Sequence, residues 1–357
     1  MLGIASGHRL TGEADRALEA LAEARPLAYD EAAARERIAL HYLRGSVLFA
    51  SNRLAESRAE HLLAYEGARA LADVEHEAHA LSGLGDADYA QGLVRSACAR
   101  FDACLALCDA HGLVRIAIPN RVMRGHCRSY LGDFAGARAD IAQAATVAAR
   151  VRNRHAEMFA LQSLGILLTS WNKFGEAESS QARAMTIARE IGARRYLPAI
   201  LAHHAESLFA RGERRQAHEQ LREAYAIAHE GSMAFAGGMV LGMLMRVVDD
   251  PDERAAVAQE GEALLAAGAL SHNHVFFRRY GIEEGLAHGD LESVLRHAAA
   301  LESYTRHEPL PYSDLLIRRA RALVAVARAP HDAAARAEVR KLEVEARALD
   351  WPLTWPD

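Results

Sequence analysis

The sequence is poor in proline, cysteine and aromatic residues, and it lacks long hydrophobic runs. Nine prolines in 357 residues leave room for long uninterrupted helices, and four cysteines are too few for a disulfide framework. No stretch approaches the roughly 18 apolar residues that a membrane helix needs, and residues 1–8 lack the apolar core of a secretory signal. These absences predict a cytoplasmic protein with no membrane partner.

An excess of positive charge is also missing. The chain has 42 lysines and arginines against 47 acidic residues, a formal net charge of -5. Binding to a nucleic-acid backbone depends on surplus cations, so no direct nucleic-acid partner is expected. Hydrophobic residues make up 51% and charged residues 25%, which excludes a disordered chain. The abundance of Ala, Leu, Glu and Arg favours helix almost throughout.

Small residues recur with a strict period of 40, which indicates a repeat protein. The first series is Ala5, Gly45, Gly85, Gly125, Gly165 and Ala205. Seven residues later comes the series Gly12, Asn52, Gly92, Gly132, Asn172 and Gly212, whose residue types close helices or form tight turns. Two further series of small residues follow: Ala17, Ser57, Ala97, Ala137, Ala177 and Ala217, then Ala24, Ala64, Cys104, Ala144, Ala184 and Ala224.

Each unit is therefore interpreted as a helix A, a short turn at the Gly or Asn, and a helix B. A Gly inside a helix costs about 1 kcal/mol relative to Ala, so its recurrence predicts a close helix crossing there. The positions of Tyr89, Gly92, Ala97 and Phe101 resemble the tetratricopeptide motif, whose usual period is about 34 residues. The predicted fold is an all-α, right-handed, tetratricopeptide-like α-α superhelical solenoid of about nine helix pairs.

The register of the repeat divides the chain. Six regular repeats are expected over residues 1–232, irregular repeats with three more helix pairs over 233–350, and a tail over 351–357. The first helix has no polar capping helix ahead of it, which predicts that the chain is part of something longer. In the tail, Trp351 and Trp355 are expected to cover the open face of the last helix.

Two stretches carry a family resemblance. One runs over residues 83–92 and on to Phe101 and Cys108, and the other runs over residues 271–277 and on to Tyr304 and residues 309–314. Together they resemble the C-terminal tetratricopeptide region of large bacterial proteins that join a class III adenylate or guanylate cyclase domain and an AAA-type ATPase domain to a helical tail. The resemblance implies a regulatory or partner-binding role for a nucleotide-signalling enzyme.

No catalytic residue can be carried over from that family. The chain has no phosphate-binding G-x-x-x-x-G-K-[ST] loop and no paired metal-binding aspartates in a strand-rich domain. A small-molecule hydrolase would need a convergent nucleophile and base, and the sequence shows none. The chain is therefore predicted to be no enzyme and to bind no cofactor.

The phase of the repeat points to a binding surface on the A helices, the concave side of such solenoids. Mixed aromatic and polar residues there suit an extended peptide or an amphipathic helix, although packing between adjacent A helices is the alternative. The predicted binding residues are Tyr42, His79, Asp86, Tyr89, His126, Phe159, Gln162, Glu206 and Phe209. A row of Arg121, Arg124 and Arg128 could hold an acidic group or be solvated.

The 18 histidines suggest metal sites, but their spacing does not favour one. His76 and His79 stand at i and i+3, whereas the zinc-protease helix needs i and i+4, so a polar helix face is favoured. His272 and His274 would point apart on a helix, and Ser271 is predicted to be the N-cap of that helix. The segment of residues 271–274 either lines a binding surface or closes a repeat junction.

The cysteines can be placed by phase. Cys104 and Cys108 could form a redox pair, but most of their equivalents in other units are Ala, which favours small buried fillers. Cys127 is expected to be buried and Cys98 exposed.

The preferred function is a non-catalytic protein-binding or peptide-binding module, the sensory or regulatory tail of a nucleotide cyclase/ATPase signalling protein. Its partner would be a protein or peptide, including domains of the same polypeptide. The alternative is the effector-sensing arm of an ATPase-coupled (STAND-type) transcription regulator, which would end in a DNA-binding helix-turn-helix that the sequence does not show.

Overall fold

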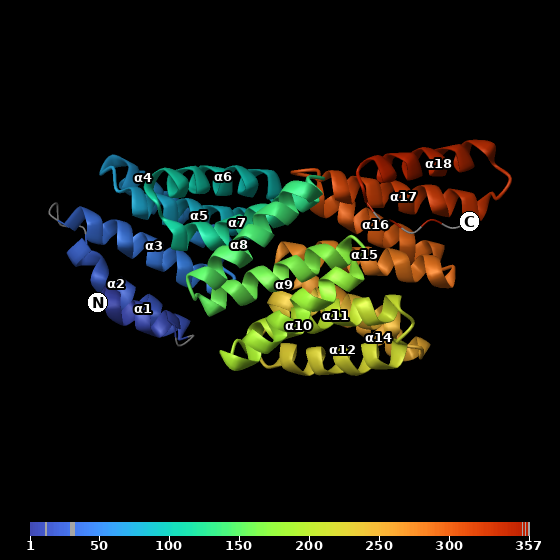
Figure 1. The fold of residues 1–357 in the computed structure, drawn as a ribbon, viewed down its shortest axis with the longest axis horizontal. Helices are drawn as coiled ribbons and strands as arrows, with labels where there is room; N and C mark the ends of the chain where they lie inside the picture. The colour runs from blue at the N-terminus through green and yellow to red at the C-terminus, as the bar shows by residue number, and fades with distance from the viewer. Residues whose placement is uncertain (11–12, 29–32, 352, 354, 356–357) are drawn as a thin grey trace. The chain divides into compact units, whose positions relative to one another are not determined.

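A computed structural model describes residues 1–10, 13–28, 33–351, 353 and 355. These residues form helices joined by short turns, and no strand occurs among them. Figure 1 shows the helices in chain order. They are α1 (Leu2–Leu10), α2 (Ala14–Ala28), α3 (Ala34–Ala50), α4 (Leu54–Ala70), α5 (Val74–Ala90), α6 (Val94–His111), α7 (Val114–Tyr130), α8 (Phe134–Arg150), α9 (Arg154–Ser170), α10 (Phe174–Glu190), α11 (Leu197–Ala210), α12 (Arg214–His229), α13 (Gly238–Val247), α14 (Pro251–Ala266), α15 (Ser271–His288), α16 (Leu291–Thr305), α17 (Pro311–Arg328) and α18 (Ala333–Ala348). A 3-10 helix, η2 (Arg194–Tyr196), precedes α11, and a π-helix, η3 (Met233–Gly237), precedes α13.

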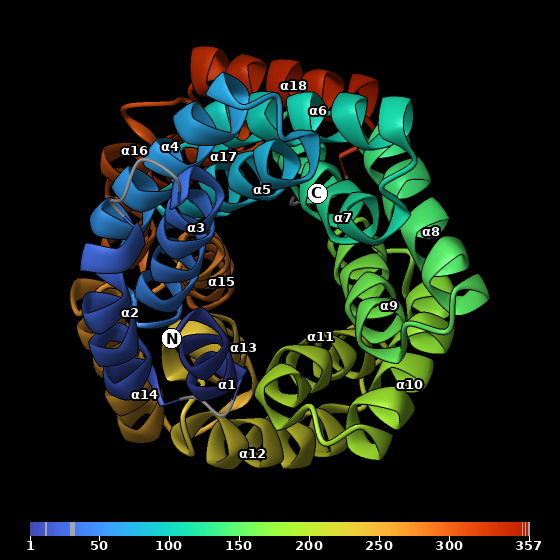
Figure 2. The ribbon, with the colours of Figure 1, turned by 90° about the vertical axis from the view of Figure 1, so that its left-hand side faces the viewer.

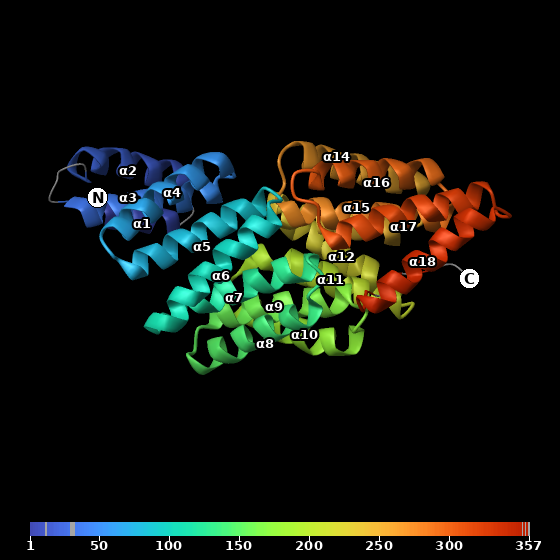
Figure 3. The ribbon, with the colours of Figure 1, turned by 90° about the horizontal axis from the view of Figure 1, so that it is seen from above.

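The chain divides into two compact units, Met1–Cys127 and Arg128–Asp357, with the boundary inside α7. In the first unit, Figure 2 shows α3 and α5 on the inner side of a curved wall and α4 and α6 on the outer side. In the second unit, α9, α11, α13 and α15 lie on the inner side, and α10, α12 and α14 on the outer side. Figure 3 shows the same alternation in α14 to α17, with α14 and α16 on one side and α15 and α17 on the other.

The turns between the helices explain the 40-residue period of the sequence, because each repeat contains two of them. Residues with positive φ stand every 20 positions: Asn52, Ala72, Gly92, Gly112, Gly132, Arg152, Asn172, Gly192 and Gly212. Each lies just beyond a helix end, where a left-handed residue lets the next amide bond back to the last turn, as Arg53 N does to Leu48 O at 2.9 Å. The A-to-B turns were predicted from Gly and Asn, and they are confirmed except at Gly12, which lies outside the described residues. The B-to-A turns include Ala72 and Arg152, whose residue types give no such signal.

The recurrent glycines lie at helix crossings, as predicted. A Cβ added to Gly45 would stand 2.8 Å from the His61 ring, and one added to Gly85 would stand 2.5 Å from the Phe101 ring. A Cβ on Gly165 would approach Cγ of Gln181 to 2.7 Å. Each obstructing side chain comes from the helix B of the same pair. The glycines therefore let a B-helix side chain fill the space that their own side chain would occupy.

The small residues of the B helices are buried as well. All six members of the first B-helix series, Ala17 to Ala217, have 0% exposure. In the first unit, the Ser57 hydroxyl also donates a hydrogen bond to the Gly45 carbonyl at 2.8 Å, which joins α4 to α3. Close A/B contact therefore depends on two small positions in each pair, one on each helix.

Beyond residue 232 the helices form three further pairs, α13 with α14, α15 with α16 and α17 with α18, in agreement with the predicted number. The tail differs from expectation. Trp351 is buried against Tyr312 of α17, with ring centroids 5.6 Å apart, and Trp355 lies 5.5 Å from the Arg319 guanidinium. The indoles thus pack on α17, while Val344 of the last helix stays 65% exposed.

Candidate functional site

Five of the predicted binding residues come from three A helices of the first unit. Tyr42 belongs to α3, His126 belongs to α7, and His79, Asp86 and Tyr89 share α5. On α5, Asp86 follows His79 by seven residues and precedes Tyr89 by three, so helix geometry puts all three on one side. The Tyr42 and His79 rings lie 5.1 Å apart, and those of Tyr89 and His126 lie 6.5 Å apart. We call these five residues the inner face of the first unit.

Burial keeps this face largely uncharged. It lowers the pKa of His79 and raises the pKa of Tyr42, so both rings are neutral near pH 7. Tyr89 is buried, whereas Tyr42, His79 and His126 are half-buried. These rings present apolar edges and π-faces together with a few polar atoms, a combination suited to gripping a peptide.

Asp86 is the exception on this face. Its carboxylate is half-buried, and the described residues give it no hydrogen bond and no ion pair. Burial alone raises its pKa to about 7. Because no cation compensates for the lost hydration of the carboxylate, ionising Asp86 in the folded protein costs free energy.

The other four predicted binding residues belong to the second unit, and they do not come together in one binding site. They are Phe159, Gln162, Glu206 and Phe209. Phe159 of α9 lies 6.1 Å from Tyr196, and Phe209 of α11 lies beneath Arg214 and Arg246, whose guanidinium carbons are 5.5 and 5.1 Å from its ring centroid. Gln162 is 3% exposed, and its Oε1 has no hydrogen-bond partner. Two of the four thus pack within the unit, which was the alternative interpretation.

Glu206 differs from its predicted role because it is buried in an ion-pair network. Its carboxylate pairs with Arg279 and accepts a hydrogen bond from Tyr280 Oη at 2.7 Å, both on α15. His203 Nδ1 lies 3.4 Å from the same carboxylate. Burial opposes ionisation, but the Arg279 charge and these hydrogen bonds outweigh it and lower the pKa of Glu206. Arg279 and Tyr280 were missed because nothing in the repeat register links α15 to α11.

The three arginines proposed for an acidic ligand have partners within the protein. Arg121 pairs with Asp109 at 2.6 Å and Arg124 with Asp102 at 3.0 Å, both across to α6. In the second unit, Arg128 pairs with Asp140 of α8 at 2.9 Å. Their charges hold adjacent helices together, so they are no longer candidates for binding an acidic ligand.

The histidines near residues 76 and 272 have structural partners. Asp73 caps α5, and His76 Nδ1 lies 3.1 Å from its Oδ2. His272 Nε2 bonds the Phe235 carbonyl at 2.6 Å, and burial lowers the pKa of His272 to about 4. Ser271 is not the predicted N-cap, because α15 already begins at this residue and its hydroxyl bonds Tyr304 instead. The described residues contain no group of three potential metal ligands.

The cysteines are free thiols. Cys104, Cys108 and Cys127 are buried, as predicted. Cys98 is half-buried rather than exposed, because its thiol lies within hydrogen-bonding reach of Cys127 on the next helix. The Cys104 and Cys108 sulfurs are 4.0 Å apart, and Cys104 Sγ donates to the Ala78 carbonyl at 3.3 Å. Cys104 and Cys108 therefore occupy small buried positions in the core, as the repeat phase predicts.

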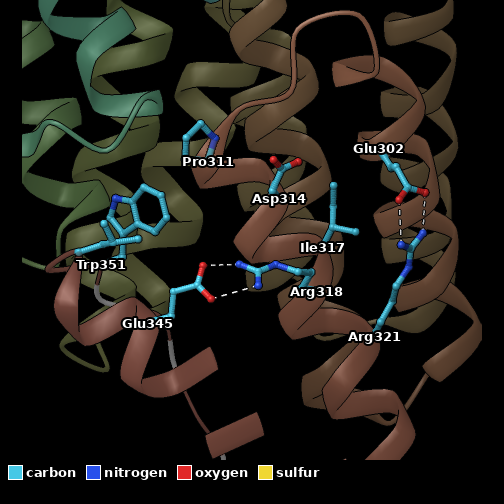
Figure 4. Close-up of a pocket in the computed structure, with 9 residues that line it drawn as sticks. Glu302, Pro311, Asp314, Ile317, Arg318, Arg321, Glu345 and Trp351 are labelled. Carbon is cyan, nitrogen blue, oxygen red and sulfur yellow. Dashed lines mark hydrogen bonds and ion pairs between the residues drawn. The ribbon is translucent and has the colours of Figure 1, made fainter. Parts of the chain in front are cut away.

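The second unit also has an open cavity of about 500 Å³ beside α16, α17 and α18. Figure 4 shows that Arg318 reaches Glu345 and Arg321 reaches Glu302, with Ile317 between the two ion pairs. Both arginines are therefore neutralised within the protein, while the indole Nε1 of Trp351 in the same lining is buried without a hydrogen-bond partner. The lining is formed by Glu302, Pro311, Asp314, Ile317, Arg318, Arg321, Glu345, Leu349 and Trp351.

Solved structures share this architecture. A Rap protein complexed with competence and sporulation factor aligns over 98% of this chain and 97% of its own, with a TM-score of 0.68 and 13% identity. The chain has a Rap-like fold. Aspartyl phosphate phosphatase F from Bacillus subtilis covers 84% of this chain and 76% of its own, with a TM-score of 0.60 and 12% identity. The Rap conjugation gene regulator of the plasmid pLS20, in complex with the Phr* peptide, covers 88% and 91%, with a TM-score of 0.60 and 11% identity.

The Rap-like fold confirms the predicted tetratricopeptide-like helical-repeat class. At 11 to 13% identity the likeness concerns the fold alone. No protein-family model and no curated protein matches the chain. Among the described residues, every helix is too short or too polar to cross a membrane.

Proposed function

We propose that the chain is a non-catalytic, regulatory helical-repeat module that binds a peptide or an extended protein segment on its A helices. The observation that carries this proposal is the inner face of the first unit, which combines four aromatic or imidazole rings with an unpaired carboxylate. Aromatic rings supply contact area at low entropic cost, and isolated polar groups fix the register of a bound chain. Two proteins with the same fold were solved with a factor or peptide bound, which supports a ligand of that kind.

The cellular setting of this module is a finer proposal. The resemblance of residues 83–92 and 271–277 to cyclase/ATPase tails supports a regulatory role toward a nucleotide cyclase in the cytoplasm, with domains of the same polypeptide as partners. The alternative is the sensing arm of a STAND-type transcription regulator. The neighbouring coding sequence separates the two, because a cyclase domain supports the first and a helix-turn-helix domain supports the second.

Peptide binding can be tested with an array of immobilised peptides and two matched histidine variants. His126 lies on the inner face, whereas His111 is exposed at the end of the outer helix α6. We expect His126→Ala to weaken the strongest array signals about tenfold, the cost of losing one well-placed ring. His111→Ala should leave them unchanged. Equal losses in both variants, or no specific signal with the unmodified protein, would contradict the proposal.

A further inference from the structure

The unpaired state of Asp86 is unusual in this protein. Comparable acidic side chains on the A helices have cationic partners: Asp88 pairs with Arg58 at 2.7 Å, and Glu157 pairs with both Arg154 and Arg183. Glu206, which stands three repeats after Asp86 in the same phase, pairs with Arg279. Asp86 has no such partner among the described residues.

Among the described residues, no cation contributes to the pKa of Asp86. Arg9 of α1 acts on Tyr42 but not on Asp86. Its negative charge is felt by Tyr42 of α3, Cys104 of α6 and Cys127 of α7, none of which is a cation. Because neighbouring side chains have already removed part of its water, an incoming cation would meet a weakly screened charge. Such a carboxylate gains more from an ion pair than a fully exposed one does.

The neighbouring rings favour the same ligand chemistry. His79 and Tyr89 flank Asp86 along α5, and the Tyr42 ring lies against His79. The faces of aromatic rings attract cations, and their edges pack against the methylene groups of long side chains. A carboxylate beside neutral rings is therefore complementary to a cation at the end of an aliphatic stem.

We propose that Asp86 binds the side-chain cation of an arginine or lysine residue in the ligand, with Tyr42, His79 and Tyr89 contacting the stem of that residue. This inference rests on the proposed peptide-binding function and names one chemical feature that the peptide carries. Asp86 then sets specificity, and the rings contribute affinity that is less selective.

The test uses the full chain and a positional-scanning hexapeptide library whose termini are acetylated and amidated, so that side chains supply the only cations. At about pH 8, where Asp86 is ionised, the unmodified protein should select arginine or lysine at one position. Replacing that residue by neutral citrulline, or by norleucine for lysine, should weaken binding at least about tenfold. The same replacement should have little effect on the Asp86→Asn variant, because the charge that it recognises is gone.

A matched control removes one negative charge elsewhere in the first unit. Glu66 is exposed on the outer helix α4, so Glu66→Gln should keep the full discrimination against citrulline. Asp86→Asn conserves shape, and an unchanged or raised thermal midpoint will show that it folds. Selection of no cation by the unmodified protein, or equal discrimination by Asp86→Asn, would overturn the inference while peptide binding stands. If the unmodified protein binds no library member, both this inference and the proposed function fail.

Discussion

Tyr280 Oη donates a hydrogen bond of 2.7 Å to Glu206 across 74 residues of sequence, and it joins α15 directly to α11 within the second unit. In a simple solenoid each repeat contacts only its neighbours. Here the buried carboxylate also pairs with Arg279, so two helices that are not adjacent in the chain share one ion-pair network. Both partners of the Glu206 carboxylate come from the protein itself. The network accounts for the burial of Glu206, which repeat phase alone would assign to the binding surface.

Glu206→Ala should therefore destabilise the protein strongly. Removing the carboxylate leaves the Arg279 charge buried without a partner, which costs about 3 to 5 kcal/mol in free energy of unfolding. Urea denaturation followed by circular dichroism will measure it. Glu178→Ala is the matched control: its carboxylate pairs with Arg211 at 2.6 Å near the surface, and such pairs contribute about 0 to 1 kcal/mol. Similar losses in the two variants would contradict the network.

Gly85→Ala tests the helix crossing in the first unit. Helix propensity alone would favour Ala by about 1 kcal/mol, but its Cβ would stand 2.5 Å from the buried Phe101 ring. We expect a net loss of about 1 to 3 kcal/mol, typical of overpacking. Gly175→Ala is the matched control, because no atom lies within 4 Å of its added Cβ, and it should be neutral or stabilising. A gain in the urea midpoint for both variants would show that the crossing is not tight.

Ala177→Leu tests the partner position on helix B. Ala177 is fully buried where α10 meets α9, so three extra carbon atoms should overpack the contact and cost about 1 to 3 kcal/mol. Ala139→Leu on α8 supplies the comparison, since that residue is exposed. An unchanged urea midpoint for Ala177→Leu would mean that the repeat phase is wrongly assigned.

Asp86→Asn should stabilise the free protein, and the gain should grow with pH. The pKa of Asp86 is raised from 3.8 to about 7 on folding, so the folded state holds its proton to higher pH than the unfolded state does. Ionisation of Asp86 therefore lowers the stability of the unmodified protein as pH rises from 3.8 through 7, and the variant lacks this contribution.

The difference in unfolding free energy should be near zero at about pH 4 and on the order of 1 to 3 kcal/mol at about pH 8. Urea midpoints at several pH values will measure it. The facing groups Tyr42, Cys104 and Cys127 stay neutral over this range because burial or a neighbouring thiol raises their pKa values, and His79 titrates in both proteins. A difference that does not change with pH would contradict a raised pKa.

Much of the local structure in the repeats follows from the sequence alone. The helices follow from composition, and the left-handed A-to-B turns follow from the recurrence of Gly and Asn, residue types that readily adopt positive φ. The left-handed turns at Ala72 and Arg152 carry no such signal. The tight A/B crossings could also be predicted, since only a missing side chain lets two helices approach at Gly45 or Gly85. The predicted inner face of the first unit rests on the same periodicity.

Only the tertiary structure decided which predicted site residues keep a free functional group. Asp86 and Glu206 occupy the same phase of the repeat, yet one carboxylate is unpaired and the other is neutralised by Arg279. Periodicity encodes the contacts between neighbouring helices, because these recur with the repeat. A partner 73 residues away, on a helix outside the regular register, is set by how the chain curves in space, and no local pattern records it.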